Sequence, residues 1–200
     1  MKTADEILKA LSAPFTKQVG DKQIPDLKWL PTSAVSGGKK MMCTAYITRA
    51  QVIDRLNEVM GVDGWMSRLE LQVDKTQICI LSLKINGEWV DRSDVGTQSA
   101  TKGTEAKGAA SDALKRAATN FGIGSYIYKL PAKFVDAKAG TNGKPAPCTK
   151  DGKILYASQL HDYLNGMSTA QGYLAELLRY MPELFGREDV KKLWNDLKTL

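Results

Sequence analysis

The residue types that most often carry catalysis are sparse in this chain of 200 residues. The single histidine, His161, rules out chemistry that depends on a histidine cluster, and Ser-His or Cys-His catalytic arrangements lack their histidine. The three cysteines, Cys43, Cys79 and Cys148, are too widely and irregularly spaced for a C-x-x-C metal pair, and their odd number favours free, inert thiols. We therefore expect no metal ion and no other cofactor.

A phosphate-binding loop is the next candidate for chemistry. Gly143-Lys144 fails the Walker pattern, because Lys138 stands where the first glycine is needed and Pro145 replaces the Ser or Thr that would hold magnesium. Gly122-Ile123-Gly124 follows a predicted helix, which is typical of a helix end and turn and not of a dinucleotide-binding loop. The sequence thus predicts a protein that does not hydrolyse ATP.

Three acidic residues near the end of a predicted strand leave one enzymatic alternative open. Glu88, Asp91 and Asp94 lie close in sequence, and paired carboxylates can hold two metal ions for nuclease chemistry. Arg92 lies between them and no matching Lys or His accompanies them, which favours salt-bridged or solvated carboxylates. We expect a protein that is not an enzyme, with a metal-dependent nuclease as the minor alternative.

The central part of the chain shows the clearest secondary-structure signals. Thr48 and Gln51 form a capping box before an apolar helical pattern that Gly61 ends. Residues 65–73, 78–85 and 88–90 follow as predicted strands, and Asn86-Gly87 is the signal of a two-residue hairpin turn. Three antiparallel strands, a meander, are therefore expected in sequence order.

A helix with a face of small residues is predicted at 104–121. Its apolar face consists of Ala106, Ala110, Ala113, Leu114, Ala117 and Phe121. Small residues allow a helix to approach a sheet closely, so this helix should cross one face of the meander. The expected fold class is α+β, with a β-β-β-α core.

The flanking regions complete the expected organisation. A short amphipathic helix at 4–12 carries Ile7, Leu8 and Leu11 on one side, and residues 41–47 form a plausible strand beyond a polar, proline-containing stretch. The Pro- and Gly-containing composition of 132–157 predicts a linker, and short helices are expected at 158–165, 169–180 and 187–200. We divide the chain into a domain at 1–131, a linker at 132–157 and a C-terminal helical segment at 158–200.

Basic residues gather around the alanine-rich helix. The net charge is +6, which favours a polyanionic partner. Lys115 and Arg116 are adjacent, Lys107 lies two turns earlier, Lys102 precedes the helix, and Lys39-Lys40 forms a basic turn. Tyr46, Tyr126 and Tyr128 could stack on bases, although core packing accounts equally well for tyrosines in such positions.

The same residues carry a resemblance to a known family. The stretches that match are Ala45-Tyr46-Ile47, the helix 52–60, the turn Gly61-Val62-Asp63-Gly64-Trp65, Asp94-Val95-Gly96 and the block AKGAASDALKRAATNFGIGSYIYKLP from Ala106 to Pro131. Together they cover about residues 28–131, and in them the chain resembles the Rad52/Rad22 family of recombination proteins, with the size of its phage single-strand annealing members. The resemblance implies a ring of subunits that holds single-stranded DNA in an outer basic groove.

The resemblance also assigns DNA-binding residues. It places Lys115 and Arg116 against the DNA backbone and implies contacts from Lys107, Tyr46, Lys39 and Lys40, with Lys102 as the candidate for a second, outer site. The chain departs from the family pattern at two places and so has fewer basic residues for DNA. Residues 32–36 contain no arginine, and Thr119 stands where family members often carry a further basic residue.

The expected function is therefore ATP-independent binding and annealing of single-stranded DNA in recombination and repair. A monomeric double-stranded RNA-binding module is the alternative, because helix, three strands and helix is also its order of elements. The expected partners are single-stranded DNA, further copies of the chain, and a single-strand binding protein or an exonuclease. With no apolar run long enough for a membrane span and no export signal at the N-terminus, we expect a cytoplasmic protein of a bacterial or phage-infected cell.

Overall fold

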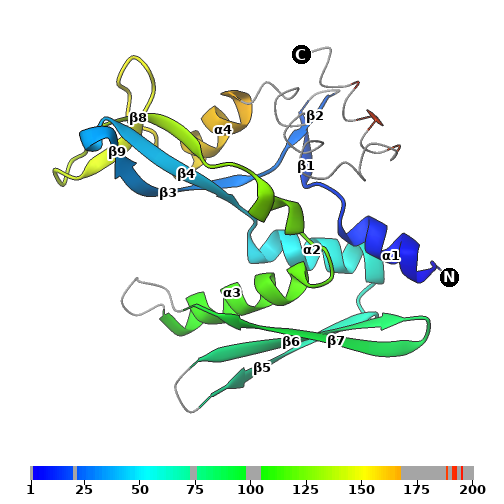
Figure 1. The fold of residues 1–200 in the computed structure, drawn as a ribbon. Helices are drawn as coiled ribbons and strands as arrows, with labels where there is room; N and C mark the ends of the chain where they lie inside the picture. The colour runs from blue at the N-terminus through cyan, green and yellow to red at the C-terminus, as the bar shows by residue number, and fades with distance from the viewer. Residues whose placement is uncertain are drawn as a thin grey trace. The chain divides into compact units, whose positions relative to one another are not determined.

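The computed structural model describes residues 2–19, 22–72, 76–97 and 105–167, together with the single residues 188, 191, 192 and 195. The chain forms two compact units, and each of them combines separate stretches of sequence (Figure 1). Unit 1 consists of Met1–Ala13 and Ile47–Ser125, and unit 2 consists of Pro14–Tyr46 and Tyr126–Leu200.

Two capped helices begin unit 1. In α1 (Ala4–Leu11), Thr3 and Glu6 form a capping box; Ile7 and Leu11 are buried, whereas Leu8, expected on the same face, is 42% exposed. Helix α2 (Arg49–Met60) has the predicted capping box of Thr48 and Gln51 and ends at Gly61, whose φ of 75° lies in the left-handed region. The predicted start and end of α2 are thus confirmed.

The sheet of unit 1 contains three antiparallel strands in the order β5-β6-β7. They are β5 (Trp65–Leu71), β6 (Gln77–Ile85) and β7 (Glu88–Gly96). Asn86 and Gly87 have φ values of 53° and 87°, the backbone of the tight turn predicted between β6 and β7. Alternate residues of β6, Cys79, Leu81 and Leu83, are buried, so one face of the sheet belongs to the core.

Helix α3 (Glu105–Thr119) covers that face, against β6 and β7 (Figure 1). Its buried residues are Ala109, Ala113, Leu114, Ala117 and Ala118. Ala106, expected in the core, is exposed, and Ala110 is half-buried, so the buried face is rotated relative to the predicted one. The approach is close: a Cβ atom at Gly96 would lie 1.9 Å from the carbonyl oxygen of Ala109. The alanine-rich helix therefore packs on the sheet as expected.

Unit 2 contains a four-stranded antiparallel sheet in the order β3-β4-β8-β9, and a separate two-stranded sheet. The larger sheet consists of β3 (Lys28–Val35), β4 (Lys40–Tyr46), β8 (Lys133–Ala139) and β9 (Pro145–Cys148), and the smaller one of β1 (Thr16–Val19) and β2 (Lys22–Pro25). One 3₁₀ turn, η1 (Ser36–Gly38), lies in unit 2, and the other, η2 (Ser125–Lys129), begins at the last residue of unit 1. Of these strands, the sequence predicts only β4.

The segment 132–157 differs most from its prediction. Its composition indicates a linker, whereas β8 and β9 form a hairpin that extends the sheet of β3 and β4. Pro145 and Pro147 are compatible with a strand because β9 lies at the edge of the sheet, where one side of the backbone needs no donor. Proline content alone therefore indicates a linker where the fold places an edge strand.

Helix α4 (Ala157–Met167) packs against β3, with Leu160 and Leu164 buried. The indole Nε1 of Trp29 donates to Asn165 Oδ1 at 2.9 Å, and Asn165 Nδ2 donates to the carbonyl oxygen of Leu27 at 2.9 Å. The helix predicted at 158–165 is thus present. The helices predicted at 169–180 and 187–200 lie outside the described ranges, apart from the four single residues.

Candidate nucleic-acid interface

The residues predicted to bind DNA divide between the two units. Lys107, Lys115 and Arg116 belong to α3 of unit 1, whereas Lys39, Lys40 and Tyr46 belong to unit 2. Lys102 lies outside the described residues. The structure therefore contains two candidate surfaces, one on each unit.

The adjacent Lys115 and Arg116 each lie beside an acidic residue. Lys115 Nζ is 3.5 Å from Asp112 Oδ1, and Arg116 Nε is 3.0 Å from Asp94 Oδ1. The backbone amides of Thr97 and Val95 donate to Asp112 and Asp94, at 3.0 Å and 2.7 Å, which fixes both carboxylates in place. The two cations are 23% and 44% exposed, so both reach the surface with their charge partly compensated.

The acidic residues of β7 do not form the arrangement that a two-metal nuclease needs. Asp91 and Asp94 are three positions apart in one strand, so their side chains point to opposite faces of the sheet. Asp94 faces α3 and pairs with Arg116. Within the described ranges, no three His, Cys, Asp or Glu residues lie together in a way that could hold a metal ion.

The three cysteine thiols are free, as expected from the sequence. Cys43, Cys79 and Cys148 are free and buried. Burial raises the pKa of the Cys43 thiol to about 11, and burial likewise raises the pKa of the Cys79 thiol despite the nearby positive charge of Arg49. Both thiols therefore stay protonated at neutral pH and are poor nucleophiles.

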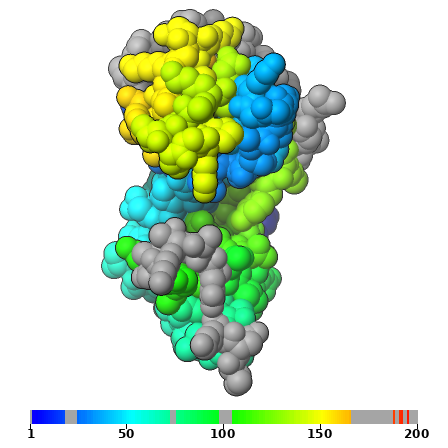
Figure 2. All heavy atoms as spheres, turned by 90° about the vertical axis from the view of Figure 1, so that its left-hand side faces the viewer, coloured from blue at the N-terminus to red at the C-terminus, as the bar shows by residue number. Residues whose placement is uncertain are grey.

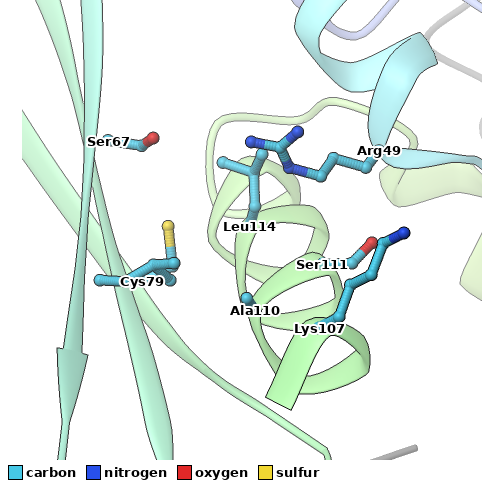
Figure 3. Close-up of a pocket in the computed structure, with 8 residues that line it drawn as sticks. Arg49, Ser67, Cys79, Lys107, Ala110, Ser111 and Leu114 are labelled. Carbon is cyan, nitrogen blue, oxygen red and sulfur yellow. The ribbon is translucent and has the colours of Figure 1, made fainter. Parts of the chain in front are cut away.

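A groove of about 320 Å³ lies between β5 and α3 in unit 1. Leu69, Leu114, Cys79 and Ala110 provide its apolar lining, and Ser67 and Ser111 add hydroxyl groups. Figure 3 shows Arg49 reaching from α2 toward the space between the sheet and α3, with Lys107 rising from α3. The sequence pattern did not identify Arg49 as a candidate binding residue. Arg49 directly follows the N-cap of α2, and the N-terminus of a helix is a common site for binding an anion.

The basic turn of unit 2 lies at the surface. Lys39 is exposed, while Lys40 Nζ pairs with Asp136 Oδ1 of β8 at 2.7 Å. Ser36, Gly37 and Gly38 all have positive φ values, 54°, 66° and 85°, which turn the chain sharply before β4. Figure 2 shows this turn, in blue, beside the yellow hairpin of β8 and β9.

The three candidate tyrosines have different environments. Tyr126 is 1% exposed and its hydroxyl accepts the backbone N–H of Phe15 at 3.0 Å, so it is a core residue. Tyr46 is half-buried, and its ring lies edge-on to His161 with the ring centres 6.4 Å apart. Tyr128 is 69% exposed, and sequence reasoning passed over two further exposed aromatic residues of unit 2, Phe134 and Tyr156.

A family of known proteins matches the region that contains the three-stranded sheet and the basic, alanine-rich helix. The model of the Rad52/22 family double-strand break repair protein matches residues 9–145. The chain belongs to the Rad52/22 family. The matched range contains α2, β5, β6, β7 and α3 together with the basic turn, as the sequence resemblance implied.

Two similar bacterial proteins are both named single-stranded DNA-binding protein DdrA. The protein from Deinococcus deserti is 30% identical over 183 residues, which are 92% of this chain and 85% of the relative. The protein from Deinococcus radiodurans is 31% identical over 136 residues, which are 68% of this chain and 61% of the relative. In the part of the chain that the structure describes, no helix combines the length and the apolar character required to cross a membrane.

Proposed function

We propose that this protein binds single-stranded DNA and anneals complementary strands without ATP, as an oligomeric ring, in recombination and DNA repair. The observation that carries the proposal is the basic face of α3, which presents Lys107, Lys115 and Arg116 from one rigid helix. Membership of the Rad52/22 family and the names of the two relatives support it. Lys39, Lys40 and Tyr46 of unit 2 are proposed as further DNA contacts, and Lys102 is proposed as the candidate for a second, outer site.

The geometry of α3 suits contact with a DNA backbone. Lys107, Ser111 and Lys115 are spaced four residues apart and therefore lie along one stripe of the helix. The two lysines are about 12 Å apart along the axis at 1.5 Å per residue. Cations that contact phosphates leave the base edges available for pairing, which annealing requires.

The carboxylates beside Lys115 and Arg116 favour reversible binding. A phosphate must compete with Asp112 and Asp94 for these cations, so each contact contributes little net affinity. Several subunits bound to one strand would compensate for weak single contacts, because linked sites raise the effective concentration of one another. No nucleotide hydrolysis is needed, since stacking of the product duplex contributes about 1.4 kcal/mol per base-pair step.

Binding and annealing can be tested on the whole chain. We expect labelled single-stranded oligonucleotides to bind with an affinity that falls with salt, and complementary strands to pair faster with the protein present, without nucleotide and with a metal chelator. In the double variant Lys115→Ala, Arg116→Ala, the slope of log affinity against log salt should fall by about 0.7 per lost contact. An unchanged slope would refute this site, and an obligatory requirement for ATP or magnesium would refute the mechanism.

The order α2-β5-β6-β7-α3 is also that of a double-stranded RNA-binding module, which remains the alternative function. Light scattering coupled to size-exclusion chromatography separates the two proposals. A ring gives a mass many times that of the 21.9 kDa chain, and the RNA-binding module gives a monomer. Competition between single-stranded DNA and duplex RNA of equal length provides the second, independent measurement.

A further inference from the structure

The groove between β5 and α3 contains two cations that the described residues do not neutralise. Arg49 and Lys107 are both exposed, and neither side chain has an ion pair or hydrogen bond with another described residue. By contrast, Lys115, Arg116 and Arg68 each lie within 3.5 Å of a carboxylate oxygen. Two cations without a carboxylate partner among the described residues therefore border the groove.

The lining of the groove combines this charge with an apolar surface. Leu69 is 52% exposed on β5, an unusual position for a leucine of a sheet that has a buried face, while Leu114 is buried on the opposite wall. Ser67 and Ser111 place a hydroxyl group on each side, and both can donate or accept a hydrogen bond. A ligand that fits has an anionic group, polar atoms and an apolar face.

The size of the groove restricts that ligand to a single small unit. Its volume of about 320 Å³ lies at the lower end of ligand pockets, which measure roughly 300–1,000 Å³. Lys107 and Ser111 lie on the same helix stripe as Lys115, so a chain of phosphates that leaves the groove along α3 reaches Lys115. This continuity favours one unit of a nucleic-acid strand over the side chain of an acidic peptide.

We propose that the groove holds one nucleotide of the bound DNA strand, with its phosphate between Arg49 and Lys107 and its sugar and base against Leu69 and Leu114. The inference rests on the proposed binding of single-stranded DNA, and it assigns Arg49 as a DNA-binding residue. A nucleotide held in this way is withdrawn from pairing, while its neighbours along α3 remain available. The groove thus anchors the strand at one point in each subunit.

The charge requirement is tested with Arg49→Ala in the full chain, using oligothymidylate binding over a range of salt concentrations. We expect affinity to fall several-fold and the salt slope to fall by about 0.7, as for one lost phosphate contact. Lys84→Ala is the matched control, because Lys84 is an exposed cation of β6 that points away from α3. It should leave the salt slope unchanged. Circular dichroism and thermal unfolding are used to check that both variants are folded.

The steric requirement is tested with Ser67→Phe. Ser67 is exposed on an edge strand, where phenylalanine is well tolerated, and the larger side chain fills the groove without a change in charge. We expect weaker binding with an unchanged salt slope. The wild type should also prefer an intact oligonucleotide to one of equal length that lacks bases, and this preference should shrink in Ser67→Phe.

The outcomes separate the inference from the proposed function. If the wild type binds oligothymidylate but Arg49→Ala matches Lys84→Ala in affinity and slope, the groove assignment is wrong and the proposed function stands. If the wild type does not bind single-stranded DNA, the proposed function itself fails. An aspartate-rich peptide that ends in phenylalanine is the last probe. If the peptide binds only when Arg49 is present, while DNA binding does not depend on Arg49, the groove is a protein-docking site and the proposal is overturned.

Discussion

The Asp94 carboxylate accepts the Nε–H of Arg116 at 3.0 Å, so an acidic residue of β7 neutralises a cation of the proposed DNA interface. The same oxygen accepts the backbone amide of Val95 at 2.7 Å. Asp94 is 25% exposed and Arg116 is 44% exposed, so a phosphate from solvent can reach the cation. Binding of DNA at Arg116 therefore competes with an interaction inside the protein.

Removal of the Asp94 charge should strengthen DNA binding. In Asp94→Asn the guanidinium of Arg116 loses the negative charge of Asp94, which competes with phosphate, and we expect single-stranded DNA to bind several-fold more tightly, with a steeper salt dependence. Asp91→Asn is the control, because it removes the same charge from the other face of the same strand. Equal gains from the two variants would mean that only net charge matters. Stability should change by no more than about 1 kcal/mol, as for other exposed pairs.

His161 should make the stability of unit 2 depend on pH. The backbone N–H of Trp29 donates to its Nδ1 at 3.1 Å, an interaction that needs an unprotonated Nδ1. Burial lowers the pKa of His161 from 6.5, as does the positive charge of Lys28 and Lys17, whereas Asp162 and Asp26 act in the opposite direction. The unfolded chain therefore takes up a proton before the folded chain does as the pH falls.

The contribution of His161 to the free energy of unfolding is consequently complete above the pKa of the unfolded state, about 6.5. It is lost as the pH falls from there toward the lower pKa of the folded state. Thermal unfolding between pH 8 and pH 5 measures the loss. In His161→Asn, whose amide oxygen can accept the Trp29 N–H but does not titrate, the decrease over this range should be smaller. A parallel decrease in both proteins would exclude His161 as its origin.

Arg55 should be a major determinant of unit 1 stability. Its Nη1 donates to the carbonyl oxygens of Ala10, Leu11 and Ala13 at 3.1, 3.2 and 2.7 Å, and its side chain is 10% exposed. Because these acceptors lie at the end of α1, Arg55→Ala leaves carbonyl groups unsatisfied and should cost about 2–3 kcal/mol. Arg68→Ala provides the contrast: that side chain is 67% exposed, and its loss should cost at most about 1 kcal/mol. Urea unfolding of both variants provides the comparison.

Gly96 should tolerate no side chain. A Cβ atom there would lie 1.9 Å from the carbonyl oxygen of Ala109 and 2.7 Å from the backbone nitrogen of Ala113, so Gly96→Ala must push α3 away from β7. We expect a loss of stability of about 3 kcal/mol or more, since backbone cannot yield as a side chain does. Ser93→Ala, at an exposed position of the same strand, should be close to neutral. Thermal unfolding distinguishes the two, and a neutral Gly96→Ala would contradict the close approach of the α3 backbone to Gly96.

The elements that the sequence predicted correctly depend on interactions between near neighbours. The capping box of Thr48 and Gln51 spans three residues, and the turn at Asn86-Gly87 needs only two residues that accept a positive φ. The apolar periodicity of α3 likewise indicated a helix on a sheet, although it misplaced the buried face by part of a turn. Such signals can be interpreted without knowledge of the rest of the chain.

The tertiary structure decided what depends on distant pairing. Met41 pairs with Val135 across 94 residues of sequence, and this pairing turns a Pro- and Gly-containing stretch into β8 and β9 of the same sheet. The family resemblance indicated Lys107, Lys115 and Arg116 as binding residues. The position of Asp94 beside Arg116, and that of Arg49 in the groove, follow only from the packing of α2 and α3 with the sheet. Charge at a position can be deduced from sequence; whether a nearby charge compensates it depends on which backbone segments the fold brings within a few ångströms.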